Sequence, residues 1–162
     1  MIEGIISILD SKYNNAYLEL ETNNTKYIIN GYENIGKVFH GDLVQINNDK
    51  CIIKQSNIEN KSIIGVIQLY SKYKFKSNKK GIERYKFIPI EKHYPEFLVC
   101  TKVKRKYKKN ILVNIKFLSW DDKLPYGQII NILGEIDDIN ALYQGVLHKY
   151  QLVQKQIKID KN

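Results

Sequence analysis

Lysine and arginine side chains are concentrated in one stretch of the chain, and this stretch has the residue types best suited to chemistry. Residues 72–109 hold 14 of the 26 Lys and Arg residues but only three acids, so they carry +11, while the rest of the chain carries −2. Seven aromatic residues are interleaved with these cations. Cations attract phosphates, and flat rings stack on unpaired bases. The stretch predicts contact with single-stranded nucleic acid; the alternative is a solvated basic face above ordinary core aromatics.

The composition is that of a globular, non-membrane chain. It has 162 residues, 43% of them hydrophobic and 27% charged, with a net charge of +9. Ile, Lys, Asn and Tyr fill 78 positions, a usage typical of an AT-rich or viral genome, but codon bias would scatter the lysines. There is no long apolar run and no export signal. We therefore expect Cys51 and Cys100 to be free thiols in an intracellular, reducing compartment: the cytoplasm, the nucleus, a viral factory or a virion.

Residues that could support catalysis are sparse. The three histidines are isolated, and no Cys or His pair has the spacing of metal ligands. The paired carboxylates, Asp121 with Asp122 and Asp137 with Asp138, fit a turn and a helix start better than a metal site. Nucleophilic catalysis by Cys100 would need a base beside it, which the sequence does not decide. We expect no cofactor, no metal and no catalytic residue.

Short β-rich segments separated by polar turns fill the chain up to about residue 136. The first five cover residues 2–9, 16–21, 26–30, 42–47 and 50–54, and the second five cover 62–70, 82–90, 97–103, 110–118 and 127–133. The one long gap of the first set, residues 31–41, follows its third strand. Five short strands with an insertion at that point predict an OB-fold, a small Greek-key barrel. The chain is thus expected to be all-β, with two tandem five-stranded barrels.

The end of the chain has a different pattern. From Asp137 onward, apolar residues at 139, 142, 143, 146 and 147 follow helical spacing, with acids at the start and Lys149 near the end. The polar residues 55–61 form a natural boundary between the two sets of strands. We expect one domain over 1–58, a second over 59–136, and a short C-terminal α-helix with a polar tail over 137–162.

Short motifs occur in the order and spacing of a known family. In the first domain they are Glu3-Gly4, Ala16-Tyr17-Leu18, Gly31 and His40-Gly41-Asp42-Leu43-Val44. In the second domain they are Ile64-Gly65-Val66-Ile67, Phe87-Ile88-Pro89, Glu91, Tyr94-Pro95, Trp120, Leu124-Pro125-Tyr126-Gly127 and Leu133-Gly134 with Asp137. Together they resemble the paired cold-shock-type OB domains that precede the catalytic domain in the ribonuclease II and ribonuclease R family, with most similarity to the eukaryotic exosome nucleases.

The resemblance implies a fold and also an absence. In that family, the helix after the Leu-Gly element leads into a large domain whose clustered aspartates hold magnesium for phosphodiester hydrolysis. Two-metal chemistry needs several carboxylates converging on ions about 4 Å apart, and nothing in these 162 residues suggests such a cluster. We therefore expect a chain that is not an enzyme and that corresponds to the part of these proteins that binds and positions RNA.

The basic stretch maps onto the surface with which OB-folds bind single strands, namely strands 2 and 3 and the loops beside them. Alternation predicts that Tyr85 and Phe87 are core residues, while Arg84 and Lys86 face outward. The expected nucleic-acid-binding residues of the second domain are Lys72, Tyr73, Lys74, Phe75, Lys76, Lys79, Lys80, Arg84, Lys86, Lys104, Arg105, Lys106, Tyr107, Lys108 and Lys109. In the first domain, the resemblance makes Tyr17 the analogue of a stacking position, although Glu19 shares its face.

The sequence thus predicts a non-catalytic protein that binds single-stranded RNA, or single-stranded DNA, mainly through two basic loops and with little sequence preference. An alternative stays open. The chain is then a structural or adaptor subunit of a larger RNA-processing, transcription or viral nucleoprotein assembly, docked through protein contacts. The acid beside Tyr17 and the apolar C-terminal helix favour that alternative.

Overall fold

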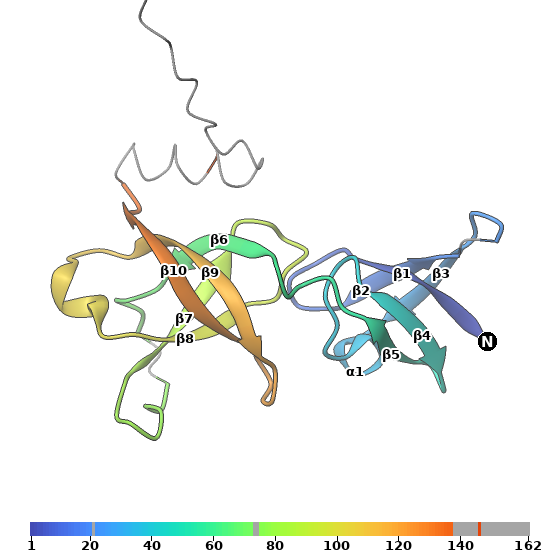
Figure 1. Ribbon diagram of the computed structural model, residues 1–162, viewed down its shortest axis with the longest axis horizontal. Coiled ribbons are helices and arrows are strands. Elements are labelled where there is room, and N and C mark those ends of the chain that lie inside the picture. The colour runs from blue at the N-terminus through green and yellow to red at the C-terminus, as the bar shows by residue number, and fades with distance from the viewer. Residues whose placement is uncertain (21, 73–74, 138–145, 147–162) are drawn as a thin grey trace, which may run out of the picture.

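The computed structural model describes residues 1–20, 22–72, 75–137 and 146. The expected C-terminal helix and tail, as well as Tyr73 and Lys74, lie outside the described residues. Within the described part of the chain, no helix is long and apolar enough to cross a membrane. The two sets of strands lie side by side along the long axis of the molecule (Figure 1).

The first set forms a five-stranded antiparallel sheet with one short helix. Its elements are β1 (Ile2–Ile8), β2 (Asn15–Glu19), β3 (Lys26–Asn30), α1 (Tyr32–Ile35), β4 (Leu43–Asn47) and β5 (Lys50–Gln55). The strands are ordered β3-β2-β1-β4-β5. No ladder joins β3 to β5 among the described residues, and α1 contacts both of these edge strands instead. The expected closure of this sheet into a barrel is therefore not confirmed.

The second set forms a closed barrel. Its elements are β6 (Ser62–Ile67), β7 (Arg84–Pro89), β8 (Phe97–Cys100), the 3-10 helix η1 (Val103–Lys106), β9 (Ile111–Ser119) and β10 (Tyr126–Glu135). The strands are ordered β10-β8-β7-β6-β9, and β9 pairs with β10 to close the barrel. Only β8 and β10 pair in parallel. This is the strand order of an OB-fold, and the first sheet shares its connectivity except for the corresponding parallel ladder.

Alternation along the strands places the core as expected. On β7, Tyr85 and Phe87 are buried, while Arg84 and Lys86 are partly exposed on the other face. On β6, a Cβ atom at Gly65 would lie against the carbonyl oxygen of Ile88 and the ring of Phe87. The Ile-Gly motif of the sequence is therefore explained by the close approach of β7 to β6.

The loop before β4 connects the cores of the two units. Val38 is buried in the core of the first sheet, whereas the next residue, Phe39, is buried in the core of the barrel. The Phe39 ring lies 6.1 Å from that of Phe97 and 5.0 Å from that of Trp120, measured between centroids. Trp120 packs against both cores. The two units therefore share an aromatic junction rather than a flexible linker.

A buried carboxylate holds this loop in place. Asp42 is fully buried and accepts hydrogen bonds from the backbone N–H of Phe39 (2.8 Å), the backbone N–H of Asn57 (2.8 Å) and the hydroxyl of Ser56 (3.2 Å). Hydrogen bonds to an ionised acceptor are among the stronger ones in proteins. Asp42 thereby ties the segment before β4 to the segment after β5, which explains the Gly-Asp motif.

Candidate nucleic-acid interface

The β6–β7 connection ends in a tight turn that presents two lysines. The Asn78 side-chain oxygen accepts from the backbone N–H of Lys80 (3.0 Å) and of Ile82 (2.9 Å). The Gly81 N–H donates to the Asn78 carbonyl (3.0 Å), and Gly81 adopts a φ of 74°, which glycine tolerates best. Lys79 and Lys80 are both exposed at this turn, so local hydrogen bonds shape a turn that carries two exposed cations.

The second basic segment is the 3-10 helix η1 and its flanks. The Thr101 hydroxyl accepts from the N–H of Val103 (3.2 Å), and the Thr101 N–H donates to the Glu83 carbonyl (3.2 Å). Val103 and Tyr107 pack against the barrel core. Because these residues anchor η1 from one side, Lys104 and Arg105 project from the other.

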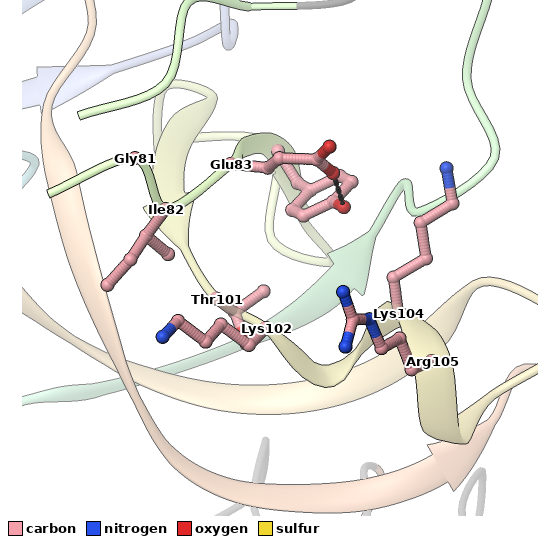
Figure 2. A pocket seen from close by; sticks show the side chains of 8 residues that line it. Gly81, Ile82, Glu83, Thr101, Lys102, Lys104 and Arg105 are labelled. Atoms are coloured by element: carbon pink, nitrogen blue, oxygen red, sulfur yellow. Dashed lines mark hydrogen bonds between the residues drawn. The ribbon is translucent and has the colours of Figure 1, made fainter.

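One cavity lies between the end of the β6–β7 connection and η1, and we call it the basic pocket. It has a volume of about 410 Å³ and is lined by Gly81, Ile82, Glu83, Tyr85, Thr101, Lys102, Lys104 and Arg105. Figure 2 shows residues 81–83 on one side of this pocket and residues 101–105 on the other. Segments that are about 20 residues apart in the sequence therefore form the walls of one opening, and its cations, Lys102, Lys104 and Arg105, all come from the second segment.

The carboxylate of Glu83 lines the basic pocket and accepts a hydrogen bond from a neighbouring side chain. The Tyr85 hydroxyl donates a hydrogen bond to the Glu83 carboxylate (Figure 2). Burial, together with this bond to an anion, raises the pKa of Tyr85 to about 12. Lys102, Lys104 and Arg105 form no ion pair with another described residue. The lining of the pocket therefore holds three cations against one carboxylate, which leaves an excess of positive charge.

A second cavity adjoins the first, and we call it the β7 pocket. Its volume is about 220 Å³, and its lining includes Phe75, Glu83, Arg84, Tyr85 and Lys104. The Arg84 guanidinium lies 5.3 Å from the ring centroid of Tyr126, and its buried Nε has no hydrogen-bond acceptor among the described residues. Because Glu83, Tyr85 and Lys104 line both cavities, the two pockets form a continuous surface.

Several predicted binding residues have other partners. The Lys86 ammonium pairs with the Glu96 carboxylate at 3.1 Å, and that of Lys109 pairs with Asp137. The hydrogen bond from Lys109 lowers the pKa of Asp137. The Tyr107 ring is partly buried and packs against the barrel core, and its contact with nucleic acid stays a prediction. Lys86, Lys109 and Tyr107 thus each have a partner within the protein.

The remaining predicted residues differ in their surroundings. Lys104 lies with its ammonium 5.2 Å from the Tyr70 ring centroid, and the Tyr70 hydroxyl donates to the Tyr107 carbonyl. The predicted cations that are exposed without lining either pocket are Lys72, Lys76, Lys79, Lys80, Lys106 and Lys108. Phe75 is partly buried at the β7 pocket.

Tyr17 lies in the first unit and lines neither the basic pocket nor the β7 pocket. The Lys26 ammonium covers its ring at 4.4 Å from the centroid. Tyr17 lines a separate cavity of about 370 Å³, together with Leu9, Lys26 and Ile28. The structure therefore does not bring Tyr17 together with the other predicted binding residues.

Two residues of the interface were not identified from the sequence. Lys102 lines the basic pocket, and its position inside the basic stretch was the available signal. Tyr126 lies beneath Arg84 because β8 and β10 pair in parallel, with Tyr126 opposite Leu98. Only the tertiary fold brings Tyr126 to this site.

The fold and the cavity together define a class of protein, an OB domain with basic side chains around one pocket. Residues 84–151 match a family model described as Dis3-like cold-shock domain 2 (CSD2). These residues, fewer than half of the chain, are similar to the second cold-shock domain of Dis3-like proteins, in agreement with the resemblance seen in the sequence.

Solved structures share the fold over nearly the whole chain. "Structure of yeast Ssd1, a pseudonuclease" matches with a TM-score of 0.68 and 14% identity, covering 91% of this chain and 24% of that one. RNase R of Mycoplasma genitalium in complex with ribose-methylated single-stranded RNA matches with a TM-score of 0.60 and 16% identity, covering 93% and 24%. Its apo form gives 0.59 and 16%, covering 90% and 23%. The chain spans about a quarter of the length of these proteins, and no curated protein sequence matches it.

Proposed function

We propose that this protein binds single-stranded RNA in the basic pocket and the β7 pocket, with little sequence preference and without cleaving it. One observation carries the proposal: Lys102, Lys104 and Arg105 line a single opening together with one carboxylate, that of Glu83, and form no ion pair with another described residue. A phosphodiester chain supplies the anions that such a surface lacks.

The chemistry of the β7 pocket supports a nucleic acid over a simple anion. Arg84 and Phe75 both line this pocket, together with Lys104. A nucleotide suits this combination, because its phosphate pairs with a cation while its base stacks on a ring. The RNA-bound structure of the M. genitalium RNase R, which shares the fold, is consistent with an RNA ligand.

The proposal that the chain is not catalytic rests on its side chains. Among the described residues, no group of three or more His, Cys, Asp or Glu could hold a metal ion. The Asp122 carboxylate accepts a hydrogen bond from the Tyr126 hydroxyl (2.9 Å), and Asp137 pairs with Lys109. These contacts suit structural roles for the paired carboxylates of the sequence.

The binding experiment is a fluorescence-anisotropy titration of the whole protein with a 12-nucleotide oligouridylate at about 50 mM salt. With about six phosphates neutralised, we expect affinity to fall with salt at a logarithmic slope near −4. The variant K102A/K104A/R105A should lose most of the affinity, whereas K50A/K54A, with two exposed lysines of β5, should retain it. Absence of RNA binding by the wild-type protein, or equal loss in both variants, would contradict the proposal.

Two further arms complete the test. An oligodeoxyuridylate of the same length distinguishes RNA from DNA, because stacking and charge serve both ligands and only contacts to the 2′-hydroxyl separate them. Incubation of end-labelled RNA with the protein and magnesium or manganese tests catalysis. We expect the label to stay intact, and protein-dependent cleavage that survives further purification would show that the chain is an enzyme.

A second candidate function is that of an adaptor, and exposed apolar side chains on the first sheet favour it. Ile28 is 70% exposed and Leu9 is 57% exposed, and both line the cavity beside Tyr17. Apolar surface of this kind suits a protein partner better than phosphates. A stoichiometric partner that is retained after nuclease treatment, and lost in the variant I28D, would support this function.

A further inference from the structure

The third strand of the first unit, β3, is an edge strand, whereas its counterpart in the barrel is not. In the barrel, the third strand β8 pairs with β7 on one side and in parallel with β10 on the other. Among the described residues, β3 pairs with β2 alone, and no ladder joins it to β5. Two units with the same strand order therefore differ in one respect: the first leaves one side of its third strand without a strand partner.

The hydrogen-bond pattern shows which backbone groups of β3 point to that side. The Gly31 N–H donates to the Asn14 carbonyl (2.8 Å), which fixes the phase of the β2–β3 ladder. Bonded and non-bonded pairs alternate along an antiparallel ladder, so Tyr27 and Ile29 direct their N–H and C=O groups to β2. The N–H and C=O groups of Ile28, between them, point away from β2.

The side chain of Ile28 is exposed as well. It is 70% exposed, more than any other large apolar side chain of the described residues except Met1. Tyr17 lies directly opposite Ile28 on β2, and Leu9 lines the same cavity as both of them. An aliphatic side chain thus stands at the centre of an unpaired edge, an arrangement that favours the addition of another strand.

The features that usually protect a sheet edge are missing from β3. The strand has neither a proline nor a register shift. Its single charged residue, Lys26, lies with its ammonium 4.4 Å from the ring centroid of Tyr17. The other edge strand, β5, carries Lys50 and Lys54 around its exposed isoleucines. Edge lysines oppose the addition of a strand, so β3 is the less protected of the two edges.

β3 is complementary to a second copy of itself. When two β3 strands pair antiparallel about a two-fold axis at Ile28, Ile28 lies opposite its own copy and Lys26 lies opposite Asn30. No like charges are then opposed within the pair. The first unit, residues 1–58, has five lysines against seven acids. Two first units can therefore approach without the strong positive charge that residues 72–109 carry.

We propose that β3 of one protomer pairs antiparallel with β3 of a second copy, which joins two first units into one continuous sheet and makes the protein a homodimer. The two Ile28 residues exchange N–H···O=C bonds, and their side chains meet on the outer face of the sheet. The Asn30 carbonyl already accepts a hydrogen bond from the Asn34 side chain (2.9 Å), so the pairing centres on Ile28. Strands of five residues bury little area, so the dimer dissociates on dilution.

Sedimentation equilibrium of the nuclease-treated protein tests the proposal. The weight-average mass should rise from 19.0 kDa toward twice that value as the concentration increases from about 5 to about 500 µM. The variant I28T keeps a β-branched side chain but buries a hydroxyl in both copies, so it should weaken association about tenfold or more. The matched control is I52T, at an exposed isoleucine of the other edge strand, and it should associate as the wild type does.

A disulfide reports on the register of the pairing. Opposite residues that exchange both backbone bonds have Cα atoms about 5.5 Å apart, a separation that a disulfide spans. In a background without the two native thiols, C51A/C100A, oxidised glutathione should therefore oxidise two I28C thiols to one disulfide and yield a covalent dimer. The matched variant I52C should yield far less of it.

The possible results separate the dimer from the proposed function. A wild type that stays at 19.0 kDa over the whole range overturns the dimer, and Ile28 is then available to the different protein of the adaptor function. Equal association of I28T and the wild type, or equal cross-linking of I28C and I52C, also overturns it, because another surface then joins the copies. In anisotropy titrations, I28T should bind oligouridylate with wild-type affinity, so the failure of RNA binding and the failure of the dimer are distinct results.

Discussion

The rings of Phe39 and Phe97 stack with centroids 6.1 Å apart and planes inclined by 14°. Phe39 belongs to the loop between α1 and β4 of the first unit, and Phe97 begins β8 of the barrel. The first unit thus supplies part of the barrel core. The stability of the barrel and its orientation against the first unit therefore both depend on the Phe39 side chain.

Replacing Phe39 with alanine should destabilise the protein strongly. Phe39 is 3% exposed, and truncation of a buried Phe costs about 3–5 kcal/mol. Urea denaturation followed by Trp120 fluorescence measures this loss, since Trp120 contacts Phe39. Leu118, exposed on β9, provides the control L118A, which should change the midpoint little. Equal effects of the two substitutions would contradict a role for Phe39 at the junction.

Asp42→Ala should destabilise the loop before β4. Its carboxylate accepts three hydrogen bonds in a buried position, and the substitution leaves the N–H groups of Phe39 and Asn57 without that acceptor. Asn57 is exposed, so the main cost is the buried Phe39 N–H. An unsatisfied buried group costs about 1–3 kcal/mol, and we expect a loss of this size in the free energy of unfolding. D121A, at an exposed aspartate, should have almost no effect in the same urea titration.

Stability should decrease as the pH falls below about 6.5. His40 accepts a hydrogen bond from the Ile8 N–H through Nδ1 (3.1 Å), and its ring lies 4.3 Å from that of His93. Burial, and then the Lys61 ammonium, lower the pKa of His40, while Glu91 opposes this shift. The unfolded chain therefore binds a proton that the folded one resists, so acidification favours unfolding.

Denaturation midpoints at pH 7.5 and pH 5.5 measure this dependence. His40→Asn keeps an acceptor for the Ile8 N–H and removes the titrating ring, so its midpoint should change less between the two pH values. The outcome that contradicts the role of His40 is the same pH dependence in the variant and in the wild type. His93, whose Nε2 lies 3.0 Å from the Glu91 carboxylate, is the neighbouring group to test next, as H93N.

Asn78→Ala should weaken RNA binding without changing the charge of the protein. The Asn78 side chain organises the turn that presents Lys79 and Lys80. Loss of the turn raises the entropic cost of ordering these lysines, so we expect a severalfold loss of affinity with a similar salt slope. Anisotropy titrations of N78A and of the exposed control N60A provide the comparison. Identical affinities would show that the turn does not order the site.

The strands were predictable from the sequence because each has one buried face. The alternation of Arg84, Tyr85, Lys86 and Phe87 predicts which side chains enter the core, and the structure confirms it. The ten predicted strands are all present. In the barrel their order is that of an OB-fold, and the first sheet has the same order without the closing parallel ladder. Such periodicity is a local property, so it can be read without knowing the partners of each strand.

The composition of the binding surface depended on tertiary structure. Lys109 and Lys86 looked like free cations in the sequence, but the fold brings Asp137 and Glu96 to them. Tyr107 lies in a run of lysines, yet its ring packs against the core. Ion pairing and burial are set by residues that are distant in the chain, and a charge count cannot reveal them.

The sequence by itself determined the strand pattern, the family resemblance and the location of the positive charge between residues 72 and 109. Only the tertiary structure decided that the barrel is closed and the first sheet is open, because the first sheet lacks a counterpart of the parallel β8–β10 ladder, which joins strands that are not adjacent in the sequence. It also brought Lys12, Tyr32, Trp120 and Lys123 around one pocket. The reason is that these residues belong to two units, whose contact through Phe39 no local pattern encodes.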